Sequence, residues 1–267
     1  MKFLPPAVRT ILGIAALALG LAACSSSPAI NDKDSAEKLY ADARDEMAAG
    51  SYDKAIKLLE RVEGKAAGSI LAQQAALDQA YAQFRSGERA ASLSTLDRFI
   101  KTHPSSPALD YAMYLKGIVN FNDNLGFLSS ISRQDISERD QQASRDAYQA
   151  FKQLVDQFPD SKYSADARVR MDYIVNALAE YELHVARYYY RRGAYVAAVN
   201  RAQYTVREYQ QTPSAQEALY IMAQCYDKLG LTQLRDDADR VLKANYPDSP
   251  FMRDGIRRPD KAWWQFW

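Results

Sequence analysis

The chain has 267 residues, of which 48% are hydrophobic and 25% are charged. Its 34 Lys and Arg residues nearly balance its 33 Asp and Glu residues. This balance excludes the strongly basic composition typical of nucleic-acid-binding proteins, so no nucleic-acid partner is expected. The two histidines, His103 and His184, stand far apart, with no Cys or acidic cluster at ligand spacing. Neither a metal site nor a cofactor is therefore predicted.

The first 24 residues have the layout of a bacterial export signal. Lys2 and Arg9 supply positive charge, and an apolar run from residue 11 to residue 23 leads to Cys24. This run is shorter than the roughly 20 residues that a membrane-spanning helix needs. The residues Leu-Ala-Ala before Cys24 resemble the lipobox of bacterial lipoproteins. That resemblance implies removal of residues 1–23 as a signal peptide and acylation of Cys24.

The same resemblance predicts where the mature protein resides. In lipoproteins of this kind, Asp directly after the acylated cysteine signals retention in the inner membrane, and this chain has Ser25 there. We expect a lipid anchor in the outer membrane, with the protein facing the periplasm and residues 24–33 as a flexible linker. Cys225 is then the only other cysteine, so no internal disulfide is expected and a buried, inert thiol is predicted.

From residue 34 onward the sequence repeats itself. Gly50 and Gly87 are 37 residues apart, as are Gly193 and Gly230, and each glycine ends one run with helical apolar spacing and opens another. Glycine at such a position can adopt the left-handed conformation that closes a helix. A proline follows 17 residues after Gly87 and again 17 residues after Gly230. This offset and period resemble the tetratricopeptide repeat.

No strand-like alternation competes with this pattern. The predicted fold class is all-α, a superhelical solenoid of about five tetratricopeptide-like helix pairs. The predicted pairs cover residues 34–66, 69–103, 107–158, 163–210 and 214–246. The small residues expected to let paired helices approach are Ala43, Ala55, Ala80, Ala147, Ala198 and Ala223.

The repeats suggest a division of the chain into parts. We predict N-terminal repeats over residues 34–158 with a substrate groove, C-terminal repeats over 159–250 as a scaffold, and an aromatic tail over 251–267. The third helix pair contains an insertion at 121–140, and the first helix of the fourth pair is unusually long and runs to Arg192. Long insertions are often functional or mobile.

The tetratricopeptide register also predicts which side chains line the concave face. Those expected to form a peptide groove are Tyr40, Arg44, Met47, Leu77, Tyr81, Phe84, Tyr111, Tyr114, Ile118 and Phe121. Aromatic rings offer a large apolar area, and Tyr adds a polar tip, so such a groove suits an extended peptide with aromatic ends. The alternative is that many of these rings pack between helices as core.

The C-terminal repeats gather tyrosine and arginine, which are residue types enriched at binding hot spots. The candidates for partner binding there are Tyr188, Arg191, Arg192, Asn200 and Arg201. An equally weighted alternative is a solvated helix end, in which the arginines complement the helix dipole.

The end of the sequence is rich in aromatic residues, namely Trp263, Trp264, Phe266 and Trp267. If exposed, such a cluster would be an aggregation liability. We expect the tail to dock on the last repeat of its own chain or on a partner, with lipid headgroups as the alternative.

The sequence contains no Gly-rich phosphate loop, no Gly-x-Ser-x-Gly elbow and no His-Glu-x-x-His motif. Its many acidic residues are spread along the helical segments, where a solvated face is the ordinary interpretation. Spacing alone leaves a carboxylate pair for glycoside cleavage open. We predict no enzymatic activity, because the repeats occupy the length that a catalytic domain would need.

Two stretches carry a more specific resemblance. Residues 145–163 include Arg-Asp-Ala-Tyr and Phe-Pro-Asp-Ser-Lys-Tyr, and residues 189–201 read Tyr-Tyr-Arg-Arg-Gly-Ala-Tyr-Val-Ala-Ala-Val-Asn-Arg. With the lipobox, the repeats and the insertion, they resemble the BamD family, lipoproteins of the outer-membrane β-barrel assembly machinery. The resemblance covers residues 20–246 and leaves the aromatic tail unmatched.

The resemblance implies partners and roles. The C-terminal repeats would bind a periplasmic POTRA domain of a BamA-like barrel subunit, with Arg201 as the coupling residue. The N-terminal repeats would receive unfolded outer-membrane proteins through their aromatic C-terminal signals, and other lipoproteins of the complex would be further partners. Because the tail itself looks like such a signal, a second hypothesis places it in the groove, where cargo would displace it.

Two other functions remain open at this point. A tetratricopeptide pilotin, a lipoprotein that aids secretin assembly for pili, would share the anchor and the repeats. A peptidoglycan hydrolase or its activator would also act in this compartment. The insertion and residues 189–201 favour the assembly factor.

Overall fold

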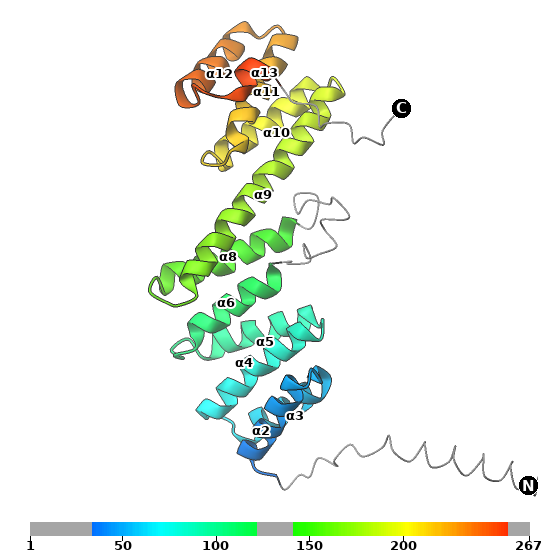
Figure 1. Ribbon diagram of the computed structural model, residues 1–267, viewed down its shortest axis with the longest axis vertical. Coiled ribbons are helices and arrows are strands. Elements are labelled where there is room, and N and C mark those ends of the chain that lie inside the picture. The colour runs from blue at the N-terminus through cyan, green and yellow to red at the C-terminus, as the bar shows by residue number, and fades with distance from the viewer. Residues whose placement is uncertain (1–33, 122–140, 256–267) are drawn as a thin grey trace, which may run out of the picture. The chain divides into compact units, whose positions relative to one another are not determined.

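The computed structural model describes residues 34–121 and 141–255, and every regular element in these ranges is a helix (Figure 1). The helices are α2 (Ala36–Ala48), α3 (Tyr52–Lys65), α4 (Ile70–Arg85), α5 (Arg89–Thr102), α6 (Leu109–Asn120), α8 (Gln141–Gln157), α9 (Ser164–Arg191), α10 (Tyr195–Glu208), α11 (Ser214–Lys228), α12 (Thr232–Asn245) and α13 (Pro250–Asp254). Apart from the short α13, they form five consecutive pairs within the five predicted spans. The all-α class of tetratricopeptide-like helix pairs is confirmed.

The chain divides into two compact units, one ending at Ala75 and one beginning at Ala76. The boundary lies within α4, whereas the predicted division between residues 158 and 159 falls inside the second unit. In the first unit, α2 and α3 pack around Leu39, Ala43 and Leu59, none of which is exposed. Amphipathic helices of this kind are stabilised mainly by burying their apolar faces against each other.

In four of the five helix pairs, the same glycine turn joins the two helices. Gly50, Gly87, Gly193 and Gly230 all have φ between 70° and 88°. In each turn the glycine N–H bonds the carbonyl three residues earlier, and the next N–H bonds the carbonyl five residues earlier; Leu231 N–H reaches the Tyr226 carbonyl at 2.9 Å. This is the Schellman arrangement, which satisfies the last carbonyls of a helix and suits glycine because a side chain is disfavoured at positive φ.

Small residues allow the paired helices to approach closely. All six predicted alanines are at most 1% exposed: Ala43, Ala55, Ala80, Ala147, Ala198 and Ala223. Helices α6 and α8 also approach closely, since a Cβ added to Gly117 would overlap the ring of Phe151. Phe151 is itself fully buried. Backbone proximity at this crossing therefore depends on the absence of a side chain at Gly117.

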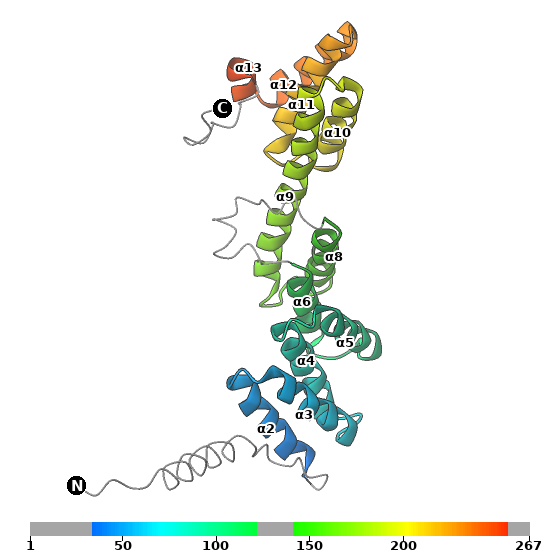
Figure 2. The same ribbon diagram turned by 90° about the vertical axis from the view of Figure 1, so that its right-hand side faces the viewer.

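The long helix α9 runs from beside α8 to α10 (Figures 1 and 2) and contributes to two clusters of the second unit's core. Its N-terminal half contributes Ile174 and Leu178 to a cluster with α6 and α8, and its C-terminal half contributes Leu183 and Ala186 to a cluster with α10, α11 and α12. The predicted overlong helix ending near Arg192 is confirmed, since α9 runs from Ser164 to Arg191.

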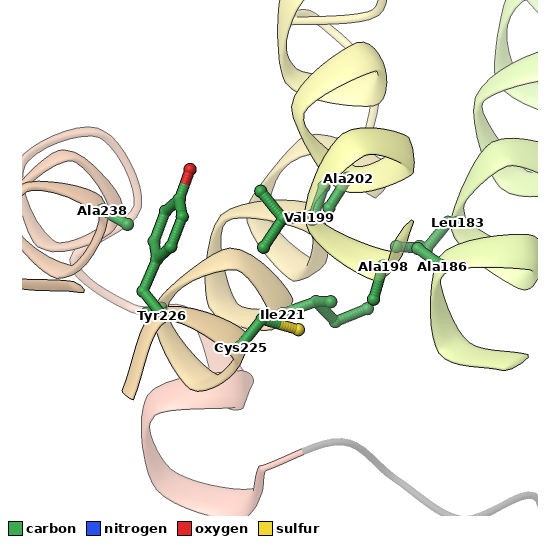
Figure 3. Packing of buried hydrophobic residues seen from close by; sticks show 11 residues of the cluster. Leu183, Ala186, Ala198, Val199, Ala202, Ile221, Cys225, Tyr226 and Ala238 are labelled. Carbon is green, nitrogen blue, oxygen red and sulfur yellow. The ribbon is translucent and has the colours of Figure 1, made fainter. Parts of the chain in front are cut away.

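The C-terminal cluster is built around α11 (Figure 3). Tyr226 lies between Val199 of α10 and Ala238 of α12, while Cys225 and Ile221 are completely buried. Burial raises the pKa of the Cys225 thiol to about 11. A thiol that resists ionisation is a poor nucleophile, which agrees with the predicted structural role.

Across the described ranges, no helix has both the length and the apolar character needed to cross a membrane. The predicted lipid site Cys24 with its signal and linker, the insertion at residues 122–140 and the tail residues 256–267 lie outside the described residues.

Candidate functional site

The predicted groove residues of the first repeat lie on α2, in the first unit. Tyr40 and Met47 are half-buried against the α2–α3 core, and Arg44 is exposed. The spacing of three and four residues places them on one helix face. They form a local aromatic and basic face of the first unit.

The remaining predicted groove residues belong to the second unit. Leu77 is 1% exposed and Phe121 is 8% exposed, so both are part of the core. Ile118 is half-buried against the core around Phe151. Tyr81 and Phe84 of α4 and Tyr111 and Tyr114 of α6 are half-buried on the core of α4, α5, α6 and α8. The predicted set of groove residues therefore contains both half-buried surface residues and core residues.

A tyrosine that sequence analysis did not single out completes this surface. Tyr163, just before α9, stacks on Tyr114 with ring centroids 4.8 Å apart and lies 5.6 Å from the ring of Tyr111. We call Tyr81, Tyr111, Tyr114 and Tyr163 the tyrosine cluster. Tyr163 ends the Phe-Pro-Asp-Ser-Lys-Tyr stretch noted in the sequence, directly before α9, so its position was a usable signal.

Hydrogen bonds fix the orientation of Tyr114. Its hydroxyl donates to Asp166 Oδ2 at 2.7 Å, and Arg170 Nε donates to the same oxygen at 2.6 Å. Burial opposes ionisation of Asp166, but the bonds from Arg170 and Tyr114 outweigh it and hold the pKa of Asp166 below its usual value. Burial, followed by the bond to Asp166, raises the pKa of Tyr114. The ring is thus held in place by an anionic acceptor.

The phenol of Tyr111 is neutral at physiological pH. Burial raises the pKa of Tyr111 to about 12, and the nearby carboxyl of Asp78 acts in the same direction. Arg85 donates to the Tyr81 hydroxyl at 2.7 Å and places its guanidinium 5.7 Å from the centroid of that ring. Half-buried rings with one arginine at their edge can pack aromatic side chains and donate to a carboxylate.

The predicted C-terminal residues occupy the end of α9 and the first half of α10. Tyr188 is 48% exposed, its ring is 5.7 Å from that of Tyr189, and the guanidinium of Arg192 lies 5.9 Å from its centroid. Arg191 and Asn200 are also exposed. These side chains form an accessible surface rich in tyrosine and arginine.

Arg201 has an internal partner that the sequence did not predict. Its Nη1 donates to Glu182 Oε2 at 3.0 Å, and the exposed fractions of the two side chains are 48% and 4%. Arg201 therefore balances a buried carboxylate on α9 while half of its guanidinium side chain stays accessible. A buried carboxylate needs such a partner because isolated burial of a charge is costly.

A second ion pair ties α9 to α11. Arg187 donates through Nε and Nη2 to both oxygens of Glu217 at 2.6 Å and through Nη1 to Glu180 at 2.6 Å. Burial disfavours the charge on Arg187, but the bonds to Glu217 and Glu180 outweigh it and raise the pKa of Arg187. Because α9 and α11 are not consecutive in the sequence, no local sequence pattern predicted this ion pair. We use the name ion-pair cluster for two separate groups that include residues of α9, namely Arg187 with Glu180 and Glu217, and Glu182 with Arg201.

A shallow groove of about 620 Å³ lies along α8, α9 and α10. Its walls include Tyr148, Tyr204 and Tyr209 together with Arg145 and Arg207. Burial raises the pKa of Tyr209 to about 12.

Within residues 34–121 and 141–255, no three side chains of His, Cys, Asp or Glu gather in a way that could hold a metal ion.

The fold and these surfaces define the chain as an all-helical repeat protein with aromatic and arginine-rich surfaces. The YfiO family, described as an outer membrane lipoprotein, matches residues 32–242. The chain belongs to this family.

Relatives match over most of the chain. The "Outer membrane protein assembly factor BamD" of Neisseria meningitidis serogroup B is 45% identical over 267 residues, which cover 97% of this chain and 100% of that protein. Proteins of the same name from Xylella fastidiosa and Haemophilus influenzae are 36% and 34% identical, covering 81% and 88% of this chain and 74% and 88% of theirs. The crystal structure of MamA protein aligns at 13% identity with a TM-score of 0.33, over 84% of this chain and 97% of that one. That similarity is too low to carry an argument.

Proposed function

We propose that this chain is a non-enzymatic outer-membrane lipoprotein that assists the folding and insertion of β-barrel proteins. The observation that carries the proposal is the 45% identity, along the whole length of the relative, to a protein named as an outer membrane protein assembly factor. The described helix pairs present aromatic and basic side chains at their surfaces. Such surfaces suit the holding of partners and cargo.

The tyrosine cluster with Phe84 is the proposed receiver of unfolded barrel proteins. Half-buried rings can pack the aromatic side chains at the C-terminal end of a barrel strand, and Arg85 at the edge can bond its carboxylate. Leu77, Ile118 and Phe121 support this surface from the core, while Tyr40 and Arg44 offer a smaller aromatic and basic face on the first unit.

The proposed site for a BamA-like subunit is the surface of Tyr188, Arg191, Arg192, Asn200 and Arg201. Arg201 is the proposed coupling residue because Glu182 bonds one part of its guanidinium and about half of the side chain stays accessible. A restrained arginine loses less conformational entropy when it bonds a partner carboxylate. The partner group in this proposal is a POTRA domain that presents an acidic side chain.

The proposed attachment to the outer membrane is a lipid on Cys24, after removal of residues 1–23, with residues 24–33 as the linker. Several acyl chains would give firm anchoring because each buried methylene contributes about 0.8 kcal/mol. The repeats over 34–158 would handle cargo, and those over 159–250 would contact BamA-like and other lipoprotein partners in the periplasm.

The proposal is tested by depleting the protein in its native host and measuring folded barrel proteins by heat-modifiable mobility on gels. We expect a general loss of folded porins together with an envelope stress response. Normal porin levels would contradict the proposal. Loss of pili alone would indicate a pilotin, and release of muropeptides by the purified protein would indicate a cell-wall enzyme.

A further inference from the structure

The turn between α11 and α12 differs from the other glycine turns. Leu229 and Leu231 flank Gly230, and Leu234 follows one turn into α12; their exposed fractions are 37%, 44% and 46%. The corresponding flanking residues of the other three turns are Ala49 and Ser51, Ser86 and Glu88, and Arg192 and Ala194. We call Leu229, Leu231 and Leu234 the leucine patch.

The helix pair does not need the leucine patch for its own packing. The buried residues of α12 are Ala238 and Leu242, and the Schellman bonds of this turn are made by backbone atoms, as in the other three turns. Three exposed leucines within six residues therefore form an apolar surface on which another apolar group can pack.

We propose that the leucine patch is covered by the chain's own C-terminal segment, residues 256–267. This segment follows α13 and carries Trp263, Trp264, Phe266 and Trp267, an apolar set that the family resemblance leaves without a role. Aromatic side chains packed on leucines bury a large area at low cost in side-chain entropy.

The starting point and the length of the segment fit this placement. Helix α13 packs on α11, with the rings of Phe251 and Tyr220 6.2 Å apart, and a Cβ on Gly255 would lie 3.4 Å from the Tyr220 hydroxyl. Leu229 is nine residues beyond Tyr220 on α11, which is about 14 Å of helix. Twelve residues span up to about 40 Å when extended. The aromatic residues can therefore reach the patch, even allowing for the length of the Tyr220 side chain.

Tryptophan fluorescence tests the proposal directly, because the three tryptophans of the chain are Trp263, Trp264 and Trp267. We would compare the mature chain carrying Cys24→Ser with a synthetic peptide of residues 256–267. We expect the tryptophan emission of the mature chain to lie at a shorter wavelength than that of the peptide. Its quenching by acrylamide should be several-fold weaker. In a Leu231→Ser/Leu234→Ser variant, both readings should approach those of the peptide while helix content by circular dichroism is unchanged.

A matched control replaces an exposed apolar residue elsewhere in the second unit. Val169 on α9 is 68% exposed, and Val169→Ser should leave emission and quenching as in the unsubstituted chain. If the double leucine variant loses helix content, the same emission and quenching measurements are made on Leu234→Ala instead.

Three outcomes would overturn the proposal. Peptide-like emission and quenching in the unsubstituted chain would show an uncovered tail. A blue shift that appears only as protein concentration rises would assign the patch to the tail of a second copy. A shift that requires added phosphatidylethanolamine and phosphatidylglycerol vesicles would assign the tail to the membrane.

Discussion

The tyrosine cluster and the ion-pair cluster, both in the second unit, are held in different ways. The tyrosines lie on an apolar core, and burial raises the pKa values of Tyr111 and Tyr114 so that the rings stay neutral. Around Arg187 and Arg201, buried or half-buried charges pair across helices. A neutral surface suits variable apolar cargo, whereas fixed charges suit one partner with a matching carboxylate.

The largest effect is expected from breaking the ion-pair cluster. Glu217→Ala leaves Arg187, whose side chain is 24% exposed, without its bidentate partner. Removing one member of a fully buried pair typically costs about 3 kcal/mol or more. Because Glu180 still bonds Arg187 here, a loss of about 2–3 kcal/mol is expected. We expect urea unfolding to show a loss of this order. A smaller loss is expected for Glu217→Gln, which keeps an acceptor, and a loss below about 1 kcal/mol for Glu217→Ala would contradict the assigned role.

The next largest effect tests the packing of α6 on α8, which supports the tyrosine cluster. In Gly117→Ala, the new methyl group would overlap the ring of Phe151, so the buried ring or the two helices must shift. Overpacking of this kind costs about 1–3 kcal/mol, measured by thermal or urea unfolding. Gly64 on α3 is a matched control, since a Cβ there meets nothing within 4 Å. Gly64→Ala should be neutral or stabilising by up to about 1 kcal/mol; equal losses in both variants would refute the close-approach argument.

A smaller effect is expected when the tyrosine cluster loses one hydrogen bond. Tyr114→Phe keeps the ring on Tyr163 but removes the donor to Asp166. The expected loss of unfolding free energy is about 1 kcal/mol, the usual net value of such a bond. The pKa of Asp166, followed by NMR titration, should rise toward its ordinary value. An unchanged Asp166 pKa would show that Tyr114 does not orient this carboxylate.

The last effect is absent at physiological pH and appears only in alkaline solution. The pKa of Tyr111 is about 12 in the folded protein, against 10.0 for an unperturbed tyrosine. Folding therefore favours the neutral form, so this stabilisation is complete below pH 10 and is lost as pH rises toward 12. Unfolding free energy measured across this range should fall less steeply for Tyr111→Phe than for the unsubstituted protein. Part of the decline should remain, because burial also raises the pKa of Tyr209 to about 12; identical slopes would contradict the burial of Tyr111.

Regular features of the chain were predictable from the sequence because they depend on local physics. Glycine at positive φ closes four helices, and alanine at the crossing points sits in the core, so spacing alone located the pairs. The register could not separate Leu77, which is core, from its half-buried neighbour Tyr81. It also missed Tyr163 and the pairing of Glu182 with Arg201, because contacts between different helices depend on the packing of the whole unit.

Two separate binding surfaces are the central claim of this account. It is tested most directly by measuring the affinities of an aromatic-ended barrel peptide and of a BamA-like POTRA domain for two variants. Tyr81→Ser/Phe84→Ser should weaken peptide binding about tenfold or more and leave the domain unaffected. Arg201→Ala should do the reverse, and domain binding should weaken more steeply with added salt than peptide binding. If both variants weaken both ligands equally, or neither variant weakens either ligand, the account of two surfaces is wrong.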